Sequence, residues 1–170
     1  MRYTEADRAL FLNSADHVAP ILLGKVLCRK AGDHIIRLRI IETEAYLDPA
    51  RDNACYGKHR TKATAPLFAL GGTCCIYAGM LLIACGDAGC ADNVLIRGCA
   101  DSEHYFSGPL RVSRALELDR SLHGADLLNS DELWLEDSAP FGHICRTTRV
   151  GLSDAVSDEA RGMALRSILI

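Results

Sequence analysis

The sequence predicts an α+β fold, a single compact domain with a mixed, mostly antiparallel sheet flanked by helices. Three observations lead to this class. The chain has 170 residues, 49% of them hydrophobic and 24% charged, which is enough for one globular core. Strand-like runs follow one another across short turns, and no repeat, low-complexity tract or linker divides residues 1–170. Helix signals stand before, between and after those runs.

Helices are predicted where capping residues stand before periodic apolar positions. Thr4 and Asp7 have the spacing of a capping box, so a short helix begins there. Ser14 can cap a second helix that Gly24 ends, and Pro109 suits the first turn of a third. The expected helical ranges are 4–12, 14–24, 109–118 and 154–163.

Strands are predicted where apolar and β-branched residues concentrate between turn signals. A turn over residues 30–33 joins the first two of them. The order of the runs, with helices at both ends and in the middle, indicates an α+β arrangement rather than a repeated βαβ unit. The expected strand ranges are 25–29, 34–46, 73–77, 80–85, 93–99, 133–136 and 165–170.

Composition excludes several classes of protein. The longest apolar run, residues 74–85, is well short of the roughly 18 residues that span a bilayer, and the N-terminal sequence has no signal-peptide pattern. We therefore expect a cytoplasmic protein without membrane contact, nucleoid-associated if the source is bacterial. With 19 Lys and Arg against 22 Asp and Glu, the net charge is -3, so a polyanion must bind through a local basic patch.

Eight cysteines raise the question of a metal site. They form no C-x-x-C pair, the six histidines form no i, i+4 pair, and the glycines match no phosphate-binding loop. Most of the cysteines lie in apolar, strand-like runs, where reduced thiols act as small hydrophobic groups. We therefore expect no metal and no cofactor.

The predicted strand 34–46 is the segment that points to chemistry. If the strand alternates regularly, one apolar face runs directly into two carboxylates and a phenol. Carboxylates on such a face are costly to bury unless they are paired, protonated or used, which favours general acid–base catalysis. The alternatives are a strand end that has reached solvent and a β-bulge that breaks the alternation. The residues expected on this face are Ile36, Leu38, Ile40, Glu42, Glu44 and Tyr46.

The same strand belongs to an ordered set of sequence blocks. These blocks are Leu22-Leu23-Gly24-Lys25-Val26-Leu27, Ile40-Ile41-Glu42-Thr43-Glu44-Ala45-Tyr46-Leu47, Gly72-Thr73, Val94-Leu95-Ile96-Arg97, Ser107-Gly108-Pro109 and Arg149-Val150-Gly151. In this order they resemble the alkyladenine DNA glycosylases, the 3-methyladenine DNA glycosylase family, and the chain would be a divergent member. The resemblance spans nearly the whole chain and is most specific at the Glu-Thr-Glu-Ala-Tyr block.

The resemblance implies a monofunctional, cofactor-free DNA N-glycosylase of base excision repair. Such an enzyme flips a damaged purine out of double- or single-stranded DNA and hydrolyses its N-glycosidic bond. By position, Glu44 matches the catalytic carboxylate that activates water, and Tyr46 matches an aromatic residue that stacks on the flipped base. Arg97 matches a cation of the pocket region. We expect the protein to act as a monomer.

Three positions depart from the family pattern. Cys55 stands where the family has a pocket histidine, and Cys85 stands where it has an asparagine that helps to discriminate purines. Ala78 replaces a tyrosine that wedges into the duplex, so the neighbouring Tyr77 is a candidate for that role. We expect both cysteines to line a reshaped pocket, which affects base flipping and lesion choice more than hydrolysis.

A basic stretch follows the catalytic strand. In the family this region borders DNA, so phosphate contacts are expected from Arg51, Lys58, Arg60 and Lys62. As a bare charge run the stretch would be a solvated loop. Two other functions stay open: a lesion-binding module of the same fold with weak turnover, and a hydrolase of small modified nucleosides, which the missing wedge and the net charge would favour.

Overall fold

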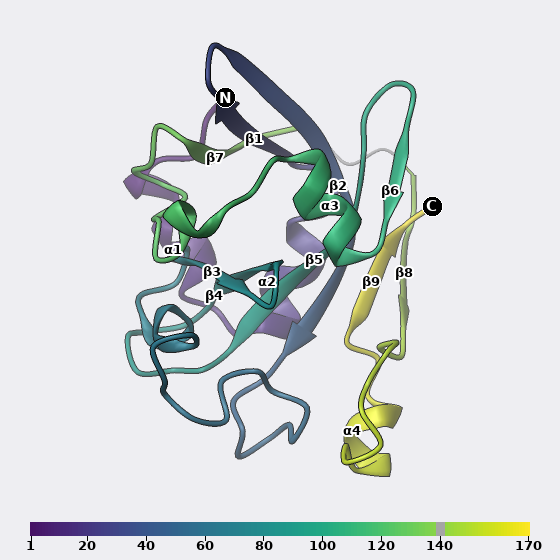
Figure 1. Ribbon diagram of the computed structural model, residues 1–170. Helices are drawn as coiled ribbons and strands as arrows, with labels where there is room; N and C mark the ends of the chain where they lie inside the picture. The colour runs from purple at the N-terminus through teal and green to yellow at the C-terminus, as the bar shows by residue number, and fades with distance from the viewer. Residues whose placement is uncertain (139–141) are drawn as a thin grey trace.

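The computed structural model describes residues 1–138 and 142–170 and has the predicted α+β architecture (Figure 1). The helices are α1 (Arg8–Phe11), α2 (Ala15–Ile21), α3 (Pro109–Ala115) and α4 (Asp158–Gly162), with short 3₁₀ helices at Glu5–Asp7, Ala65–Phe68 and Arg120–Leu122. The strands are β1 (Val26–Ala31), β2 (His34–Tyr46), β3 (Cys74–Tyr77), β4 (Met80–Ala84), β5 (Asn93–Ala100), β6 (Tyr105–Ser107), β7 (Leu133–Glu136), β8 (Ile144–Thr147) and β9 (Arg166–Leu169).

Most of the predicted elements form within a few residues of their expected bounds. The Asp7 carboxylate accepts a hydrogen bond from the Thr4 backbone N–H at 2.8 Å, as the capping box requires. Gly24 follows α2 with a φ of +83°, a conformation that favours glycine. The helix expected at 154–163 is confined to α4, where the Ser157 hydroxyl accepts from the Ala160 N–H. Strands β6 and β8 were not predicted.

Strand β2 organises the sheet, in which every described strand pair is antiparallel. The sheet order is β3-β4-β5-β2-β1-β7, with β6 on the end of β5 and β8 on the far side of β9. β1 pairs with the first half of β2, and β9 pairs with residues 42–44 of its second half. β5 pairs with β2 from Arg39 to Tyr46. The second half of β2 therefore has strand neighbours on both sides.

A β-bulge in β2 changes which side chains share a face. The register with β5 shifts between Ile40 and Glu42, which leaves Ile41 as an extra residue. Ile40 packs into the core under the helices, and so does Ala45, whereas Tyr46 packs on the opposite face. The expectation of one continuous face is therefore wrong, because the bulge separates Ile36, Leu38 and Ile40 from Glu42, Glu44 and Tyr46.

The sheet separates two hydrophobic clusters. The larger one packs under α1, α2 and α3, and the smaller one lies on the opposite face. In Figure 1 the long loop after β2 and helix α4 lie at the same end of the molecule, the lower end of the view. No helix of the described residues is both long and apolar enough to cross a membrane. The smaller cluster contains Tyr46, Leu67, Cys75, Leu82 and Leu95, with Tyr56, Tyr77, Met80 and Leu152 packed against it.

Candidate active site

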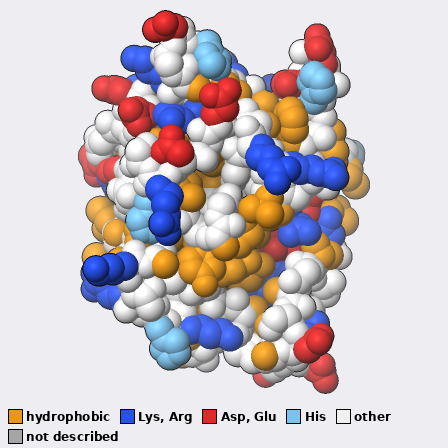
Figure 2. Space-filling model, viewed as in Figure 1, with side chains coloured by type: hydrophobic (Ala, Val, Ile, Leu, Met, Phe, Trp, Pro, Cys, Tyr) orange, Lys and Arg blue, Asp and Glu red, His pale blue; other side chains and the backbone are white. Residues whose placement is uncertain are grey.

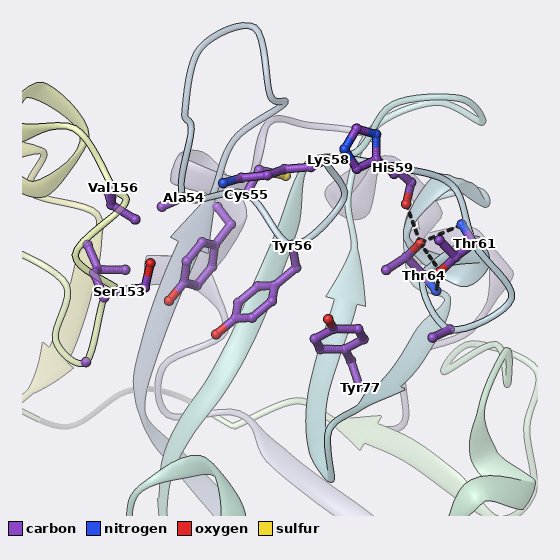
Figure 3. A pocket seen from close by; sticks show the side chains of 14 residues that line it. Ala54, Cys55, Tyr56, Lys58, His59, Thr61, Thr64, Tyr77, Ser153 and Val156 are labelled. Carbon is purple, nitrogen blue, oxygen red and sulfur yellow. Dashed lines mark hydrogen bonds between the residues drawn. The ribbon is translucent and has the colours of Figure 1, made fainter.

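A cavity of about 500 Å³ opens beside the smaller cluster (Figure 3). Its size falls in the range of small-molecule sites, of the order of 300–1,000 Å³. Three segments of the chain form its wall: the end of β2 with the following loop, the end of β3, and residues 151–156. The lining residues are Tyr46, Ala54, Cys55, Tyr56, Lys58, His59, Thr61, Ala63, Thr64, Tyr77, Gly151, Leu152, Ser153 and Val156.

The loop after β2 is anchored on both sides of Tyr56. The Cys55 sulfur accepts from the Gly57 N–H at 3.3 Å and lies 3.5 Å from the Ala91 carbonyl oxygen, to which its thiol can donate. Gly57 packs so tightly that a Cβ on it would lie 2.7 Å from the Ala91 Cβ. Burial raises the pKa of the Cys55 thiol to about 12. The backbone on either side of Tyr56 is therefore fixed by close contacts rather than free to drift.

Glu44 lies directly behind the cavity wall and is fully buried. Its Oε1 accepts from the Val150 N–H at 2.9 Å, and its Oε2 accepts from the Tyr46 hydroxyl at 2.9 Å. The Arg97 Nε lies 3.6 Å from Oε1. Tyr46 lines the cavity, and Val150 directly precedes Gly151, which also lines it. The two groups that donate hydrogen bonds to Glu44 therefore form the thin wall between this carboxylate and the cavity.

A second buried carboxylate, Glu42, holds two arginines beside Glu44. Its Oε1 lies 2.9 Å from the Arg97 Nε in an ion pair and accepts a hydrogen bond from the Arg166 Nε at 2.7 Å. Two carboxylates and two guanidinium groups balance in formal charge, which is how a low-dielectric region tolerates ionised groups. Gly98 on β5 allows the approach, because a Cβ there would lie 2.9 Å from the Glu42 Cβ.

The ring of Tyr46 is enclosed on two sides, and the side chain is only 2% exposed. The Arg149 guanidinium carbon lies 4.7 Å from the ring centre. The Tyr56 ring lies 4.6 Å away, centre to centre, at an interplanar angle of 60°. Burial, and then the nearby charge of Glu44, raise the pKa of the Tyr46 hydroxyl, so it stays protonated and serves as a donor.

Arg149 and Asp52 tie the C-terminal part of the chain to the loop after β2. Both side chains are fully buried, and the two guanidinium nitrogens donate to the two carboxylate oxygens at 2.5 and 2.9 Å. Arg149 also donates to the carbonyl oxygens of Ala45 and Ala160, both at 3.0 Å. This bidentate geometry fixes the guanidinium against Tyr46.

Comparison with known proteins identifies the family of the chain. A model of the methylpurine-DNA glycosylase family matches residues 9–168. The chain belongs to the methylpurine-DNA glycosylase family. It is 31% identical to a "Putative 3-methyladenine DNA glycosylase" of Borrelia garinii subsp. bavariensis, over 90% of each chain. A protein of the same name in Clostridium botulinum is 30% identical over 88% of each chain, and one in Chlorobium phaeovibrioides is 29% identical over 86% of each.

Several residues singled out by the resemblance to glycosylases meet at this site. Tyr46, Cys55 and Tyr77 line the cavity, while Glu44 and Arg97 lie behind its wall. The chemical roles of these residues are predictions. In the part of the chain that the structure describes, no three His, Cys, Asp or Glu side chains gather into a group that could hold a metal ion.

Cys85 does not lie at the cavity. Its side chain is fully buried in the larger cluster, on the helix side of the sheet. Alternation along β4 explains this placement, because Leu82 packs on the cavity side while Leu81 and Ile83 pack on the helix side. The expectation that Cys85 lines the pocket is therefore wrong.

The predicted DNA-contact residues fall into two groups. Lys58 lines the cavity, Arg60 and Lys62 are exposed on the same loop, and none of these three forms an ion pair with another described residue. Arg51 instead lies 2.6 Å from the buried carboxylate of Asp92. Figure 2 shows a hydrophobic patch in the middle of this face with Lys and Arg side chains on several sides of it. A polyanion therefore meets uncompensated cations on the loop that carries Lys58.

The β3–β4 hairpin places Ala78 at its exposed tip. Ala78 and Gly79 form a two-residue turn, with φ values of +48° and +79°. The methyl group of Ala78 is the side chain at this tip, whereas Tyr77 turns toward the cavity and packs against Tyr56, 5.7 Å between ring centres. The hairpin therefore presents no aromatic side chain at its outermost residue.

Sequence reasoning did not single out Tyr56 or Asp52. Tyr56 directly follows Cys55, a position predicted to lie at the pocket. An aromatic residue next to such a position was the sequence signal that could have predicted its place in the cavity. Asp52 offers no signal of its own, because its partner Arg149 is 97 positions away in the sequence.

Proposed function

We propose that the protein hydrolyses the N-glycosidic bond of alkylated or otherwise damaged purines in DNA, with Glu44 as the general base. The observation that supports this most is a buried carboxylate held by two hydrogen bonds at the wall of an aromatic cavity, in a chain of the methylpurine-DNA glycosylase family. Acid–base groups at such sites are characteristically buried and oriented by neighbouring donors.

The reaction breaks the bond between the sugar C1′ and the purine nitrogen, and a water oxygen forms the new bond to C1′. Positive charge develops on the sugar as the base leaves, and a nearby carboxylate stabilises that charge while it accepts the proton of the attacking water. The departing purine takes the bonding electron pair, so a positively charged N3- or N7-alkylated purine leaves as a neutral base. Arg97 stays paired with Glu42 while Glu44 performs this role.

Glu44 is fully buried, so the sugar and the water reach it only when side chains of the cavity wall move. Closed sites that exclude water until substrate arrives are common among enzymes. The two groups that separate Glu44 from the cavity are the Tyr46 side chain and the backbone at Val150. We expect lesion DNA to open the wall between these two groups while both keep their hydrogen bonds to Glu44.

Duplex DNA would lie across the face shown in Figure 2, where the hydrophobic patch adjoins basic side chains. Lys58, Arg60 and Lys62 are available for phosphate contacts, since no carboxylate of the described residues neutralises them. Binding should therefore weaken steeply with salt, by counterion release, even though the net charge of the chain is -3.

The test is base release from DNA. Duplex oligonucleotides with one hypoxanthine or ethenoadenine are incubated with the protein and then treated with alkali, which cleaves the strand at abasic sites. Methylated genomic DNA, with chromatography of the released bases, covers 3-methyladenine. We expect release by the wild type and its loss in Glu44→Gln. An exposed carboxylate of α4, Glu159, provides the matched control Glu159→Gln.

The two alternative functions give different results in the same experiment. Salt-sensitive binding of lesion duplexes without release of any base would mean a lesion-binding module. Cleavage of free methylated nucleosides, together with weak, salt-insensitive binding of duplex, would mean a small-molecule hydrolase. Either result would contradict the proposed function.

A further inference from the structure

We propose that Glu42 is a positioning residue for the proposed general base, because it holds the guanidinium groups of Arg97 and Arg166 away from Glu44. The inference rests on the proposed function and deepens it. It assigns a task to the second buried carboxylate of the site, which acts through its neighbours rather than on the substrate.

The two arginines contact Glu42 more closely than they contact Glu44. The Arg97 Nε lies 2.9 Å from the Glu42 Oε1 and 3.6 Å from the Glu44 Oε1. The Arg166 Nε donates to the same Glu42 oxygen at 2.7 Å, and no ion pair joins Arg166 to Glu44 among the described residues. One oxygen of Glu42 therefore takes the nearest contact of both cations.

Glu44 receives its hydrogen bonds from uncharged donors instead. These donors are the Val150 N–H and the Tyr46 hydroxyl, both at 2.9 Å. A guanidinium at that distance would form a bond roughly twice as strong, and a close opposite charge favours the ionised form of a carboxylate. A general base has to take up a proton in the transition state, so such a contact would weaken it. Holding Arg97 on Glu42 therefore leaves Glu44 better able to accept the proton.

The backbone around Glu42 brings its carboxylate to both arginines. The register of β2 with β5 shifts on both sides of Glu42, which pairs with Gly98, and the next pair skips Arg97. Irregularities of this kind re-aim a side chain next to an active site. Gly98 leaves room for the carboxylate, since a Cβ there would lie 2.9 Å from the Glu42 Cβ and 3.2 Å from its Oε2. Strand β9 brings Arg166 from the other side.

Stability alone is a weak reason for this arrangement. Glu42 is 2% exposed, and burying its charge costs desolvation, which the attraction of the two guanidinium groups has to offset. Apolar residues of similar volume often stabilise a fold equally well. A charged side chain at this position is better explained by its effect on the neighbouring carboxylate.

The experiment compares two measurements on each variant. One is the single-turnover release of ethenoadenine, and the other is the affinity for a duplex with ethenoadenine on a 2′-fluoro sugar, which resists hydrolysis. In Glu42→Gln both arginines lose their carboxylate, and Arg97 turns to Glu44. We expect release to slow roughly tenfold, the low end of the effect of an opposite charge on the protonation of a carboxylate, while affinity stays unchanged.

A second substitution separates this role from a merely structural one. Glu42→Gln/Arg97→Gln removes the guanidinium that has moved to Glu44, so release should rise about threefold or more above that of Glu42→Gln, within the coupling range of residues in contact. Loss of a second member of a purely structural network would lower activity further. The matched control is Glu42→Gln/Arg37→Gln, because Arg37 is half exposed and pairs with Glu136. It should give no recovery.

A charge-balanced variant keeps the test decisive if Glu42→Gln does not fold. Glu42→Gln/Arg166→Gln removes one carboxylate and one guanidinium, so Glu44 is again the carboxylate left beside Arg97. Release should be slow in this variant and should recover when Arg97→Gln is added. Circular dichroism and urea titration establish that each variant is folded.

Four results would overturn the inference. Near-normal release by folded Glu42→Gln would mean that Arg97 does not weaken Glu44. No recovery with Arg97→Gln, or equal recovery with Arg37→Gln, would mean that Glu42 acts through the fold or through net charge. A parallel loss of affinity would mean that it acts in binding. If the wild type releases bases while one of these results holds, the inference alone fails. If the wild type releases none, the proposed function fails and the inference with it.

Discussion

Replacing Glu44 by Gln removes the charge of the proposed general base and keeps its shape. In this variant the new amide oxygen can still accept from the Val150 N–H, and the Tyr46 hydroxyl can rotate to accept from the amide nitrogen. Arg97 keeps its 2.9 Å contact with Glu42. The local structure should therefore survive the change, and the fall in activity should report the lost chemistry.

The size of that fall follows from what the carboxylate does. Loss of a positioned general base costs roughly 100- to 10,000-fold in rate. This range corresponds to about 2.7–5.5 kcal/mol of transition-state stabilisation. Binding should change little, because Glu44 is fully buried behind the cavity wall and meets no phosphate in the resting protein.

The assay is single-turnover release of ethenoadenine, with duplex affinity measured in parallel. Glu42→Gln is the closest control, since it is the same change in the neighbouring buried carboxylate. It should destabilise the fold through its two arginines and slow release less than Glu44→Gln does. Near-normal release by Glu44→Gln, or equal losses in the two variants, would refute the role assigned to Glu44.

Three further outcomes are expected. Asp52→Asn should lower the free energy of unfolding by about 3–5 kcal/mol, because it leaves the buried charge of Arg149 uncompensated. A urea titration measures this, and a loss under about 1 kcal/mol would contradict it. Maleimide should modify the exposed Cys145 rapidly and leave Cys55 unmodified in the folded protein, because Cys55 is 2% exposed and its pKa is raised to about 12. Mass spectrometry of a maleimide-treated Cys145→Ser variant checks whether Cys55 stays unmodified. Because Ala78 places only a methyl group at the hairpin tip, release from mismatched or single-stranded lesions should exceed release from fully paired ones, and equal rates would show that another side chain fills the gap.

Local signals predicted the fold well where they were strong. The capping box at Thr4 forms, and the strand at Leu133–Glu136 has the predicted bounds. The unpredicted β6 and β8 are short and mostly exposed, so their sequences lack an apolar alternation. These segments form strands because they pair with the open edges of β5 and β9. Such an edge exists only in the assembled sheet, so the local sequence does not indicate it.

The site was predicted in part, for a related reason. Glu44 and Tyr46 share a short motif, so two positions of sequence already place them side by side. The prediction for Cys85 was wrong because it rested on the spacing of this residue from Met80. That spacing does not indicate on which face of the sheet the side chain lies. The bulge at Ile41 changed the face of the whole second half of β2, and an inserted residue of this kind has no marker in the sequence.

The second half of β2 acquires one of its two neighbours, β9, from a part of the chain that is made well after β2 itself. Arg166 on β9 meets Glu42 across 124 positions, and the segment around Arg149 closes over the loop of Asp52 across 97. When a ribosome has synthesised the chain only as far as β7, Glu44 is therefore present without its hydrogen-bond donor Val150 and without the neighbouring strand β9. The nascent protein should release no base from DNA until the segment around Arg149 and β9 have docked, so that base release begins only when these parts of the fold are in place.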